Sequence, residues 1–239
     1  MTWKNLFTSS IGKKFTMGAT GLFLITFLIV HSGINAMIFF NDGGETFNHW
    51  GHFMGSNLII RTLEIGLMAF LLIHIVQGLL LWKQNRAARP VRYAVTRPDG
   101  KSKWYSKSMG LLGTLILIFL IMHFYHFWVP SRFGGMAGIQ ALGETNLPEY
   151  NQTNVHNLYQ EMLNVFTGEY SVIVVAVYLL GCFSLCWHLL HGFQSAFQTF
   201  GVSHKRYTPI IKSIGAVYSI GISLLFASMP VAMHLGWVN

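Results

Sequence analysis

Charged side chains are scarce in this sequence of 239 residues. Asp, Glu, Lys and Arg make up 10% of it, whereas hydrophobic residues make up 52%. A soluble domain usually carries about 25% charged residues. Apolar runs recur along the whole length, so a soluble domain with one anchor is excluded. We predict an all-α integral membrane bundle that forms a single domain over residues 1–239.

Cysteine is also rare, and the N-terminal region lacks the features of a cleaved signal. The two cysteines, Cys182 and Cys186, lie four apart on one helix face, which favours packing over a disulfide or a metal site. The first long apolar run follows Lys13 and Lys14 and has no small-residue cleavage site in a suitable place. We therefore expect this run to be a membrane span.

Five apolar runs are long enough to cross a hydrocarbon core of about 30 Å, at about 1.5 Å per residue. They cover, approximately, residues 15–40, 57–82, 107–129, 169–200 and 208–235. All but Arg61 and Arg132 of the 16 Lys and Arg residues lie before the first run, or in and beside the connections between the second and third and between the fourth and fifth. Among the acidic residues, only Asp99 lies on that side. The positive-inside rule then predicts a cytoplasmic N-terminus and a C-terminus outside.

Two segments outside the runs have features of their own. The loop 83–107 is polar and strongly basic, as expected for a stop signal that contacts anionic membrane lipid, although it could also dock an acidic soluble partner. We expect no nucleic-acid partner, because the membrane already explains the charge asymmetry. The outer segment 130–168 is long, and we expect a short surface helix at Val155–Asn164.

Histidines are the unusual polar residues of the apolar runs. The runs contain His31, His74, His123, His126, His188, His191 and His234. An ionisable group inside a bilayer is a functional hypothesis by default, although one isolated histidine could equally be a packing residue. Four successive runs each carry one here. Because two helices must supply one neutral imidazole each to the iron of a low-spin haem, we predict that His31, His74, His123 and His188 are the axial ligands of two haems b.

Depth along the helices sorts these histidines into pairs. His31 and His123 each lie about 16 residues from the inner end of their runs, roughly 24 Å up. His74 lies about eight residues from the inner end of its run, roughly 12 Å up. His188 is about 12 residues from the inner end of a longer run that must project beyond the hydrocarbon. Depth thus predicts an outer pair, His31 with His123, and an inner pair, His74 with His188.

Local sequence supports the inner pair. Both His74–Gly78 and His188–Gly192 have the form His-x-x-x-Gly, which puts a residue without a side chain on the ligand's helix face. This spacing favours His188 over His191, which then corresponds to Gln77 as a group that could contact a propionate or line a site.

The third run leaves a choice open. His123 and His126 are three apart on nearly the same face, and depth favours His123, with His126 as the alternative. We assign no haem role to His49, His52, His156 and His204 outside the runs, or to His234 near the outer end of the last run.

These residues resemble a known family, the cytochrome b membrane-anchor subunit of succinate dehydrogenases and fumarate reductases in its single-polypeptide, five-helix, di-haem form. The resemblance covers essentially the whole chain. It is carried by Ser9-Ser-Ile-Gly-Lys-Lys14, Thr20-Gly-Leu, His31, His74-x-x-Gln-Gly78, His123 before Phe127-Trp128, and His188-x-x-x-Gly192 followed by Gly201. Each motif alone is weak, but their order, one per helix on four helices, is specific.

The resemblance implies a complex in a bacterial cytoplasmic membrane. A flavoprotein subunit and an iron–sulfur subunit would lie on the cytoplasmic face and interconvert succinate and fumarate. This chain would anchor them, bind no succinate, and carry electrons to or from a membrane quinone, usually menaquinone in this class. The haem of His74 and His188 would be proximal to the iron–sulfur subunit and the haem of His31 and His123 distal. The direction of the reaction and a higher oligomeric state stay open.

One position departs from the family pattern. Some members carry a glutamate two positions before the fourth-helix ligand, where it is implicated in a transmembrane proton path. This chain has Cys186 there, which puts that route in doubt.

Protonatable groups also gather on the outer side. Glu45, Glu64, His49 and His52 are candidates for proton exchange with a quinone, or else solvated loop residues. Arg61 could pair with a propionate of the distal haem, or with Glu64 three residues on.

Two other functions would also use histidines within membrane spans. The b subunit of a nitrate reductase or hydrogenase is a rival, but one ligand on each of the first four of five helices argues against it. A haem-free, proton-coupled transporter that uses the histidines as a relay is the rival of another class.

Overall fold

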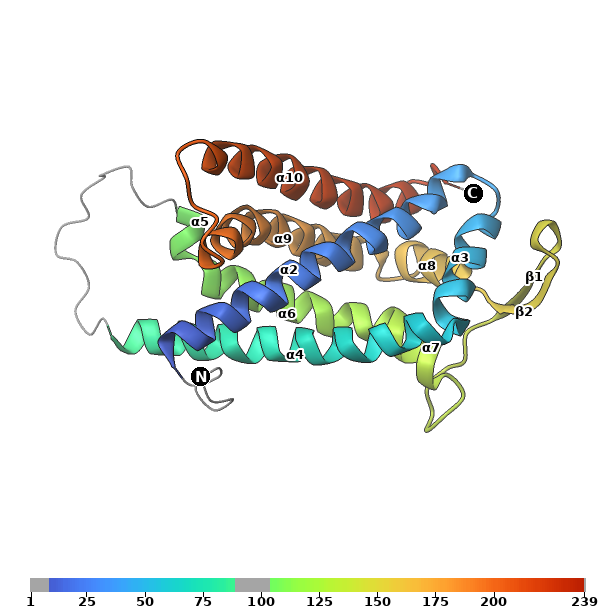
Figure 1. Ribbon diagram of the computed structural model, residues 1–239. Coiled ribbons are helices and arrows are strands. Elements are labelled where there is room, and N and C mark those ends of the chain that lie inside the picture. Colours follow the sequence, from blue (N-terminus) through green and yellow to red (C-terminus); the bar gives the residue numbers. More distant parts are fainter. Residues whose placement is uncertain (1–8, 89–103, 239) are drawn as a thin grey trace.

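The computed structural model describes residues 9–88 and 104–238, and this part of the chain is mostly helical (Figure 1). Five helical segments in it are long and apolar enough to cross a membrane, which confirms the predicted number and indicates a multi-pass membrane protein. They are α2 (Ser10–Asn35) with η1 (Ala36–Phe40), α4 (Leu58–Ala87), α6 (Met109–His123) with η2 (Phe124–Trp128) and α7 (Val129–Phe133), α9 (Ser171–Thr199) and α10 (Tyr207–His234).

The connections contain further short elements. They are α3 (Glu45–Ser56), α5 (Trp104–Lys107), the antiparallel strands β1 (Glu144–Leu147) and β2 (Gln152–His156) around η3 (Pro148–Tyr150), and α8 (Leu158–Thr167). The prediction of an all-α fold is thus incomplete, because it missed this hairpin.

The surface helix expected at Val155–Asn164 begins later than predicted. Val155 belongs to β2, where it pairs with Thr145. The side chain of Asn157 accepts a hydrogen bond from the N–H of Gln160 at 2.9 Å and so caps α8, which starts at Leu158. The predicted helix therefore exists, but its first turn is a strand.

The two ends of the bundle differ in charge and in covering. One end, here the basic end, holds the start of α2 and α10 and the end of α4 and α9 (Figure 1). The described basic residues near it are Lys13, Lys14, Lys83, Arg86, Lys107, Lys205, Arg206 and Lys212. The other end, here the capped end, is covered by α3, α7, α8 and the hairpin. Most of the predicted basic loop, and Asp99, lie in residues 89–103, outside the described residues.

Helix α9 is central to the bundle. It packs against α10, α6 and α2, and α2 packs in turn against α4. Many large apolar side chains of these helices point outward, among them Leu58, Ile65 and Val217. Outward apolar side chains are expected where the surrounding medium is lipid, which adds no hydrophobic drive for burying them.

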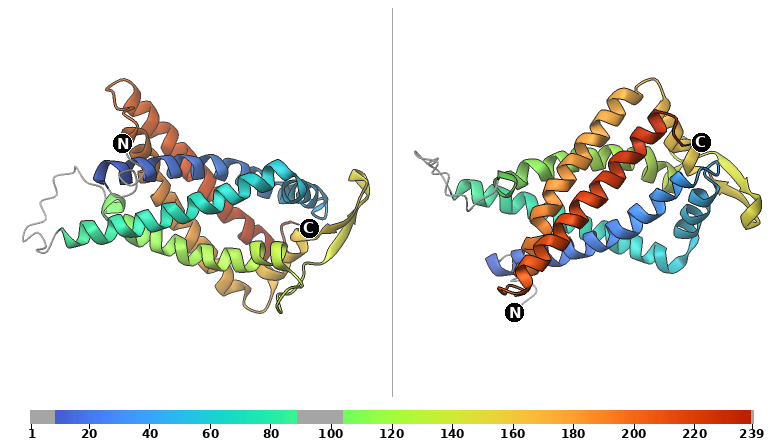
Figure 2. Two further views of the ribbon diagram at one scale, coloured as in Figure 1. Left: turned by 60° about the horizontal axis from the view of Figure 1, so that its bottom comes forward. Right: turned by 90° about the horizontal axis from the view of Figure 1, so that it is seen from above.

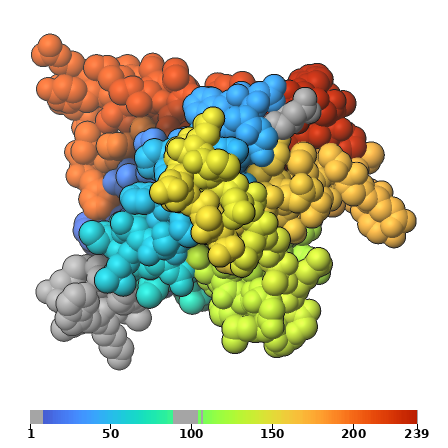
Figure 3. Space-filling model, turned by 90° about the vertical axis from the view of Figure 1, so that its right-hand side faces the viewer, coloured from blue at the N-terminus to red at the C-terminus, as the bar shows by residue number. Residues whose placement is uncertain are grey.

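A compact core closes the capped end. Ile38, Phe47, Tyr159, Phe166 and Met233 are buried together there. Gly44 lies at φ 81°, and a Cβ on it would strike the ring of Tyr159, so only glycine allows α3 to start against α8. The hairpin projects beyond the helix ends in both views of Figure 2 and lies across the middle of this face in Figure 3.

Candidate functional site

Two pairs of histidines face each other inside the bundle. Near the basic end, His74 of α4 and His188 of α9 have ring centres 6.2 Å apart and planes inclined by 67°. Nearer the capped end, His31 of α2 and His123 of α6 have ring centres 5.9 Å apart and planes inclined by 80°. These are the two pairs that depth along the helices predicts; their role as ligands stays a prediction.

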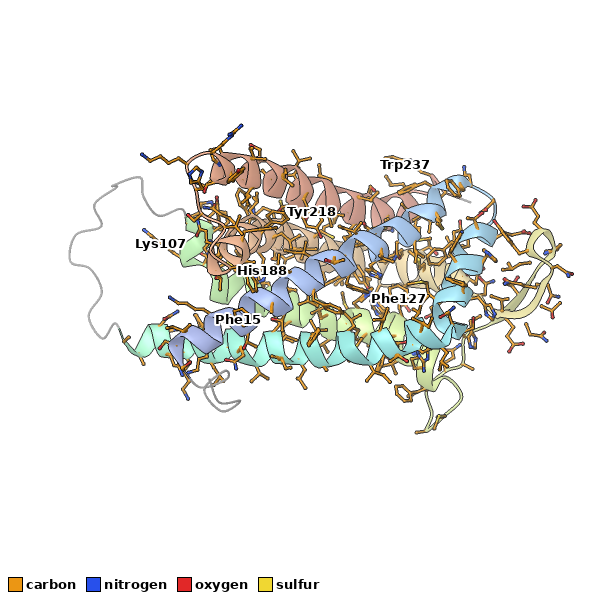
Figure 4. The ribbon with its side chains drawn as sticks, viewed as in Figure 1. Phe15, Lys107, Phe127, His188, Tyr218 and Trp237 are labelled. Carbon is orange, nitrogen blue, oxygen red and sulfur yellow. The ribbon has the colours of Figure 1, made fainter. Side chains whose placement is uncertain are left out.

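The two pairs lie at different levels of the bundle. Figure 4 labels His188 toward the basic end and Phe127 toward the capped end. Phe127 belongs to the second level, since its ring centre is 5.4 Å from that of His123. Four different helices thus supply one imidazole each, at two heights along the bundle axis.

The spacing within each pair matches that of two imidazoles on one metal. An imidazole nitrogen lies about 2 Å from the metal it binds, and its ring centre lies about 1 Å behind that nitrogen, so ring centres on opposite sides of one iron are roughly 6 Å apart. The observed separations are 6.2 Å and 5.9 Å. No three His, Cys, Asp or Glu side chains cluster in metal-binding geometry within the described residues, and a haem asks the protein for only two ligands.

Aromatic side chains surround the capped-end pair. His31 stacks on Phe27, with ring centres 5.1 Å apart, and lies 5.5 Å from Phe226 of α10. His123 stacks on Phe119, with ring centres 5.6 Å apart. Each ring is therefore held in orientation by neighbours that cannot themselves bind a metal.

Glycines lie beside the basic-end pair. A methyl group on Gly21 of α2 would lie 3.6 Å from His74 Cε1, and one on Gly113 of α6 would lie 3.9 Å from His188 Cε1. Of the two glycines that the sequence singled out, Gly192 has no atom within 4 Å of the position of an added Cβ, and Gly78 has only Met17 Cε at 3.9 Å. A methyl group added four residues past either histidine would therefore meet at most one side-chain atom.

The ring nitrogen Nδ1 has different hydrogen-bonding neighbours in the four histidines. His74 Nδ1 lies 3.1 Å from Thr20 Oγ1, and His31 Nδ1 lies 3.3 Å from Asn35 Nδ2. The Nδ1 atoms of His123 and His188 are buried without a hydrogen-bond partner. Buried polar atoms without partners are rare, and at functional sites they call for an explanation.

His126 and His123 contact different partners in the structure. His126 Nδ1 lies 3.0 Å from the hydroxyl of Tyr178, and the two rings stack with planes inclined by 7°. No ring contact pairs His126 with His31 among the described residues. The π-helical turn η2, which starts at Phe124, changes the helical register between the two histidines.

The polar residues one turn from the basic-end pair remain inside the bundle. Gln77 is buried, and His191 is half-buried on the side of α9 that also carries His188. The role of both as lining residues of the site stays a prediction.

Glu64 and Arg61 form part of an ion cluster at the capped end of α4. Arg61 donates to Glu64 at 2.7 Å, so the alternative of pairing with Glu64 is the one observed. Glu64 also accepts from Trp128 Nε1 at 2.7 Å and from Arg132 Nε at 3.0 Å. The carboxylate thus ties α4 to the segment η2–α7.

The remaining outer candidates lie in the cap. His49 stacks on Tyr150 with ring centres 3.9 Å apart, and its Nδ1 lies 3.1 Å from Gln152 Oε1, so it joins α3 to the hairpin. Glu45 begins α3, and His52 is half-buried in the same helix. The structure does not bring these three to the histidine pairs.

Three residues that contact the candidate site have no role predicted from the sequence. Thr20 contacts His74, Tyr178 contacts His126, and Arg132 contacts Glu64. In the sequence, each of the three stands out only as a polar side chain inside or beside an apolar run. The residue that each one contacts depends on how the helices cross.

Comparisons with protein-family models, with curated proteins and with solved structures found no match for this chain.

Proposed function

We propose that this chain is the membrane-anchor cytochrome b subunit of a succinate:quinone oxidoreductase, a succinate dehydrogenase or fumarate reductase. The observation that carries the proposal is the presence of two histidine pairs, on four successive membrane-length helices, with ring centres 5.9 Å and 6.2 Å apart. The order of the motifs along the sequence supports the same family.

The chain's residues would hold two haems b. His74 and His188 would hold the haem at the basic end, and His31 and His123 the one at the capped end. When bound, each haem supplies a one-electron redox centre, while the protein sets its ligation, burial and orientation. The phenylalanines around His31 and His123 would exclude water from the second site, which tunes the potential of a buried centre.

The proposal places the basic end on the cytoplasmic side of a bacterial membrane. The positive-inside rule supports this orientation. A flavoprotein and an iron–sulfur subunit would dock there, against a face whose described residues include Lys83, Arg86, Lys205 and Arg206 and no carboxylate. The chain would bind no succinate, and its own part would be electron transfer and quinone chemistry.

The exchangeable partner within the bilayer would be a quinone, of the menaquinone type in this class. Proton exchange with it requires a protonatable group near the membrane surface, and Glu64, His49 and His52 are the candidates at the capped end. Glu64 is the one of them that lies on a membrane-length helix, where it is paired with Arg61 and Arg132.

The decisive experiment is a reduced-minus-oxidised absorption spectrum of the purified protein, with haem quantified per chain. We expect b-type bands and two haems. Replacing His188 with alanine is expected to remove one haem, whereas His156→Ala on the exposed hairpin, a matched control, should remove none. Absence of b-type bands from the parent protein would refute the proposal.

Co-purification separates this function from those of other b-type cytochromes. An affinity tag on the chain should retain a flavoprotein and an iron–sulfur protein, and the complex should reduce a quinone analogue with succinate. Retention of hydrogenase or nitrate reductase subunits would assign the chain to one of those enzymes instead.

A further inference from the structure

Thr20 of α2 reaches across to His74 of α4. Its side chain is 4% exposed, and its Oγ1 lies 3.1 Å from His74 Nδ1. The opposite ring has no such neighbour, since His188 Nδ1 is buried without a hydrogen-bond partner. In the basic-end pair, Nδ1 of His74 therefore has a hydrogen-bonding neighbour, and Nδ1 of His188 has none.

The single proton of the Thr20 hydroxyl decides the direction of this hydrogen bond. Oγ1 lies 2.8 Å from the carbonyl oxygen of Thr16, which can only accept. With the hydroxyl proton on that carbonyl, the shortest of its contacts, Oγ1 is free to accept from a proton on Nδ1 of His74 at 3.1 Å. A neutral imidazole that carries its proton on Nδ1 has its lone pair on Nε2.

The capped-end pair lacks an equivalent acceptor. Asn35 approaches His31 Nδ1 with its amide nitrogen, at 3.3 Å, and the same nitrogen donates to the backbone carbonyl of His31 at 2.7 Å. His123 Nδ1 has no partner. Thr20 thus carries the one hydroxyl among the described residues that lies within hydrogen-bond distance of a ring nitrogen of either pair.

We propose that Thr20 is a positioning residue for His74. It fixes His74 in the tautomer whose Nε2 lone pair can bind a haem iron, and it makes Nε2 a stronger electron-pair donor to that iron. The proposal rests on the proposed function of the histidine pairs. A hydrogen bond from Nδ1–H to an acceptor raises the basicity of a ligating imidazole. A more basic ligand favours the ferric state, so the contact lowers the midpoint potential of the haem at the basic end.

The test uses the whole chain in its complex and the variant Thr20→Val, which keeps the shape of the side chain and removes the acceptor. Redox titration of the b-type bands should show two haems, one with its midpoint potential raised and the other unchanged. The electron paramagnetic resonance signal of the shifted haem should move as well. Thr20→Ser restores the hydroxyl and should return both readouts to those of the parent.

The matched control is Thr26→Val on the same helix. Thr26 makes the same bond to the carbonyl four residues back, at 3.0 Å, but is exposed and has no hydrogen bond to a histidine of the described ranges. This variant should leave both potentials unchanged. The haem that shifts in Thr20→Val must also be the one that His188→Ala removes.

The outcomes separate the two claims. If the parent binds no haem, the proposed function fails. If the parent binds two haems and Thr20→Val titrates like the parent, only the positioning role fails. If Thr20→Val loses a haem and Thr20→Ser does not restore it, Thr20 serves packing alone and the inference is overturned.

Discussion

At the scale of single residues, the histidines are the costly feature of this protein. A polar side chain in the apolar interior requires a compensating partner. The Nδ1 atoms of His123 and His188 have none in the protein itself. These two atoms are among the buried polar atoms that packing alone would not favour, and both belong to the facing histidine pairs, as expected of a functional site.

A prediction at this scale concerns the choice between His123 and His126. His123→Ala should remove the capped-end haem, because this ring is the one opposite His31. His126→Ala should keep both haems and lose the hydrogen bond and the ring stacking with Tyr178, at a cost of about 1–3 kcal/mol in unfolding free energy. Haem content and thermal unfolding of the two variants measure this. Loss of haem from His126→Ala alone would reverse the assignment.

A second prediction concerns Asp42, outside the membrane-length helices. Its carboxylate accepts from the N–H groups of Gly44 and Thr46, at 3.0 Å and 2.9 Å, and so caps the start of α3. Burial alone would raise the pKa of this carboxyl, but the hydrogen bonds from Thr46 and Gly44 outweigh burial and hold the pKa below its ordinary value of 3.8. A depressed pKa stabilises the folded state above pH 3.8, and this contribution is lost as the pH falls through the folded pKa.

Asp42→Ala should therefore destabilise the protein at neutral pH, by about 1 kcal/mol for a lost cap. The Tm difference between parent and variant should shrink as the pH falls below 3.8. Asp42→Asn, which keeps one acceptor oxygen, is the control and should lose less. A difference that does not change with pH would show that the charge of Asp42 plays no part.

At the scale of elements, the approach of α6 to α9 sets the capped-end pair. An added Cβ on Gly181 of α9 would lie 2.7 Å from Cγ and 3.1 Å from Cβ of Phe119 on α6. The Cβ of Phe119 cannot swing away, so α6 itself must move. Phe119 stacks on His123, and a shift of α6 therefore moves a predicted ligand.

Gly181→Ala should destabilise the protein by about 1–3 kcal/mol, the usual cost of overpacking. It should also alter the spectrum of one haem, the one that His123→Ala removes. Gly221→Ala on α10 is the matched control, because no atom lies within 4 Å of the position of its added Cβ. An equal effect of both changes on Tm would mean that helix propensity is responsible.

Sequence patterns were sufficient to predict the long helices but not the hairpin. Apolar runs located all five long helices, because lipid requires every backbone group of a span to be satisfied within the helix. The hairpin was missed, since four- and five-residue strands leave only a weak pattern. Its attachment through His49 and Tyr150 joins residues about a hundred positions apart in the chain, and no local rule predicts such a contact.

At the scale of the whole molecule, charge separates the two ends. Every described carboxylate lies toward the capped end, at Asp42, Glu45, Glu64, Glu144, Glu149, Glu161 and Glu169. The described residues near the basic end carry Lys and Arg without carboxylates. A bundle with such an asymmetry is expected to insert in one orientation only.

This orientation gives the last prediction. A cysteine introduced at Glu149, in the hairpin, should react with a membrane-impermeant maleimide added to intact cells. A cysteine at Lys205, at the basic end, should react only after the membrane is opened. The parent protein, whose Cys182 and Cys186 lie in α9, gives the background. The reverse labelling pattern would invert the proposed topology and move the docking face to the outside.

Sequence alone determined the long helices, their charge asymmetry and the four histidines to consider. Each follows from a local rule, the length of an apolar run or the rarity of an ionisable group in it. The tertiary structure decided which polar side chains contact one another. It put His126 against Tyr178, Thr20 behind His74 and Arg61 against Glu64. Contacts between helices depend on crossing angle and rotation, which packing sets and which no single helix encodes.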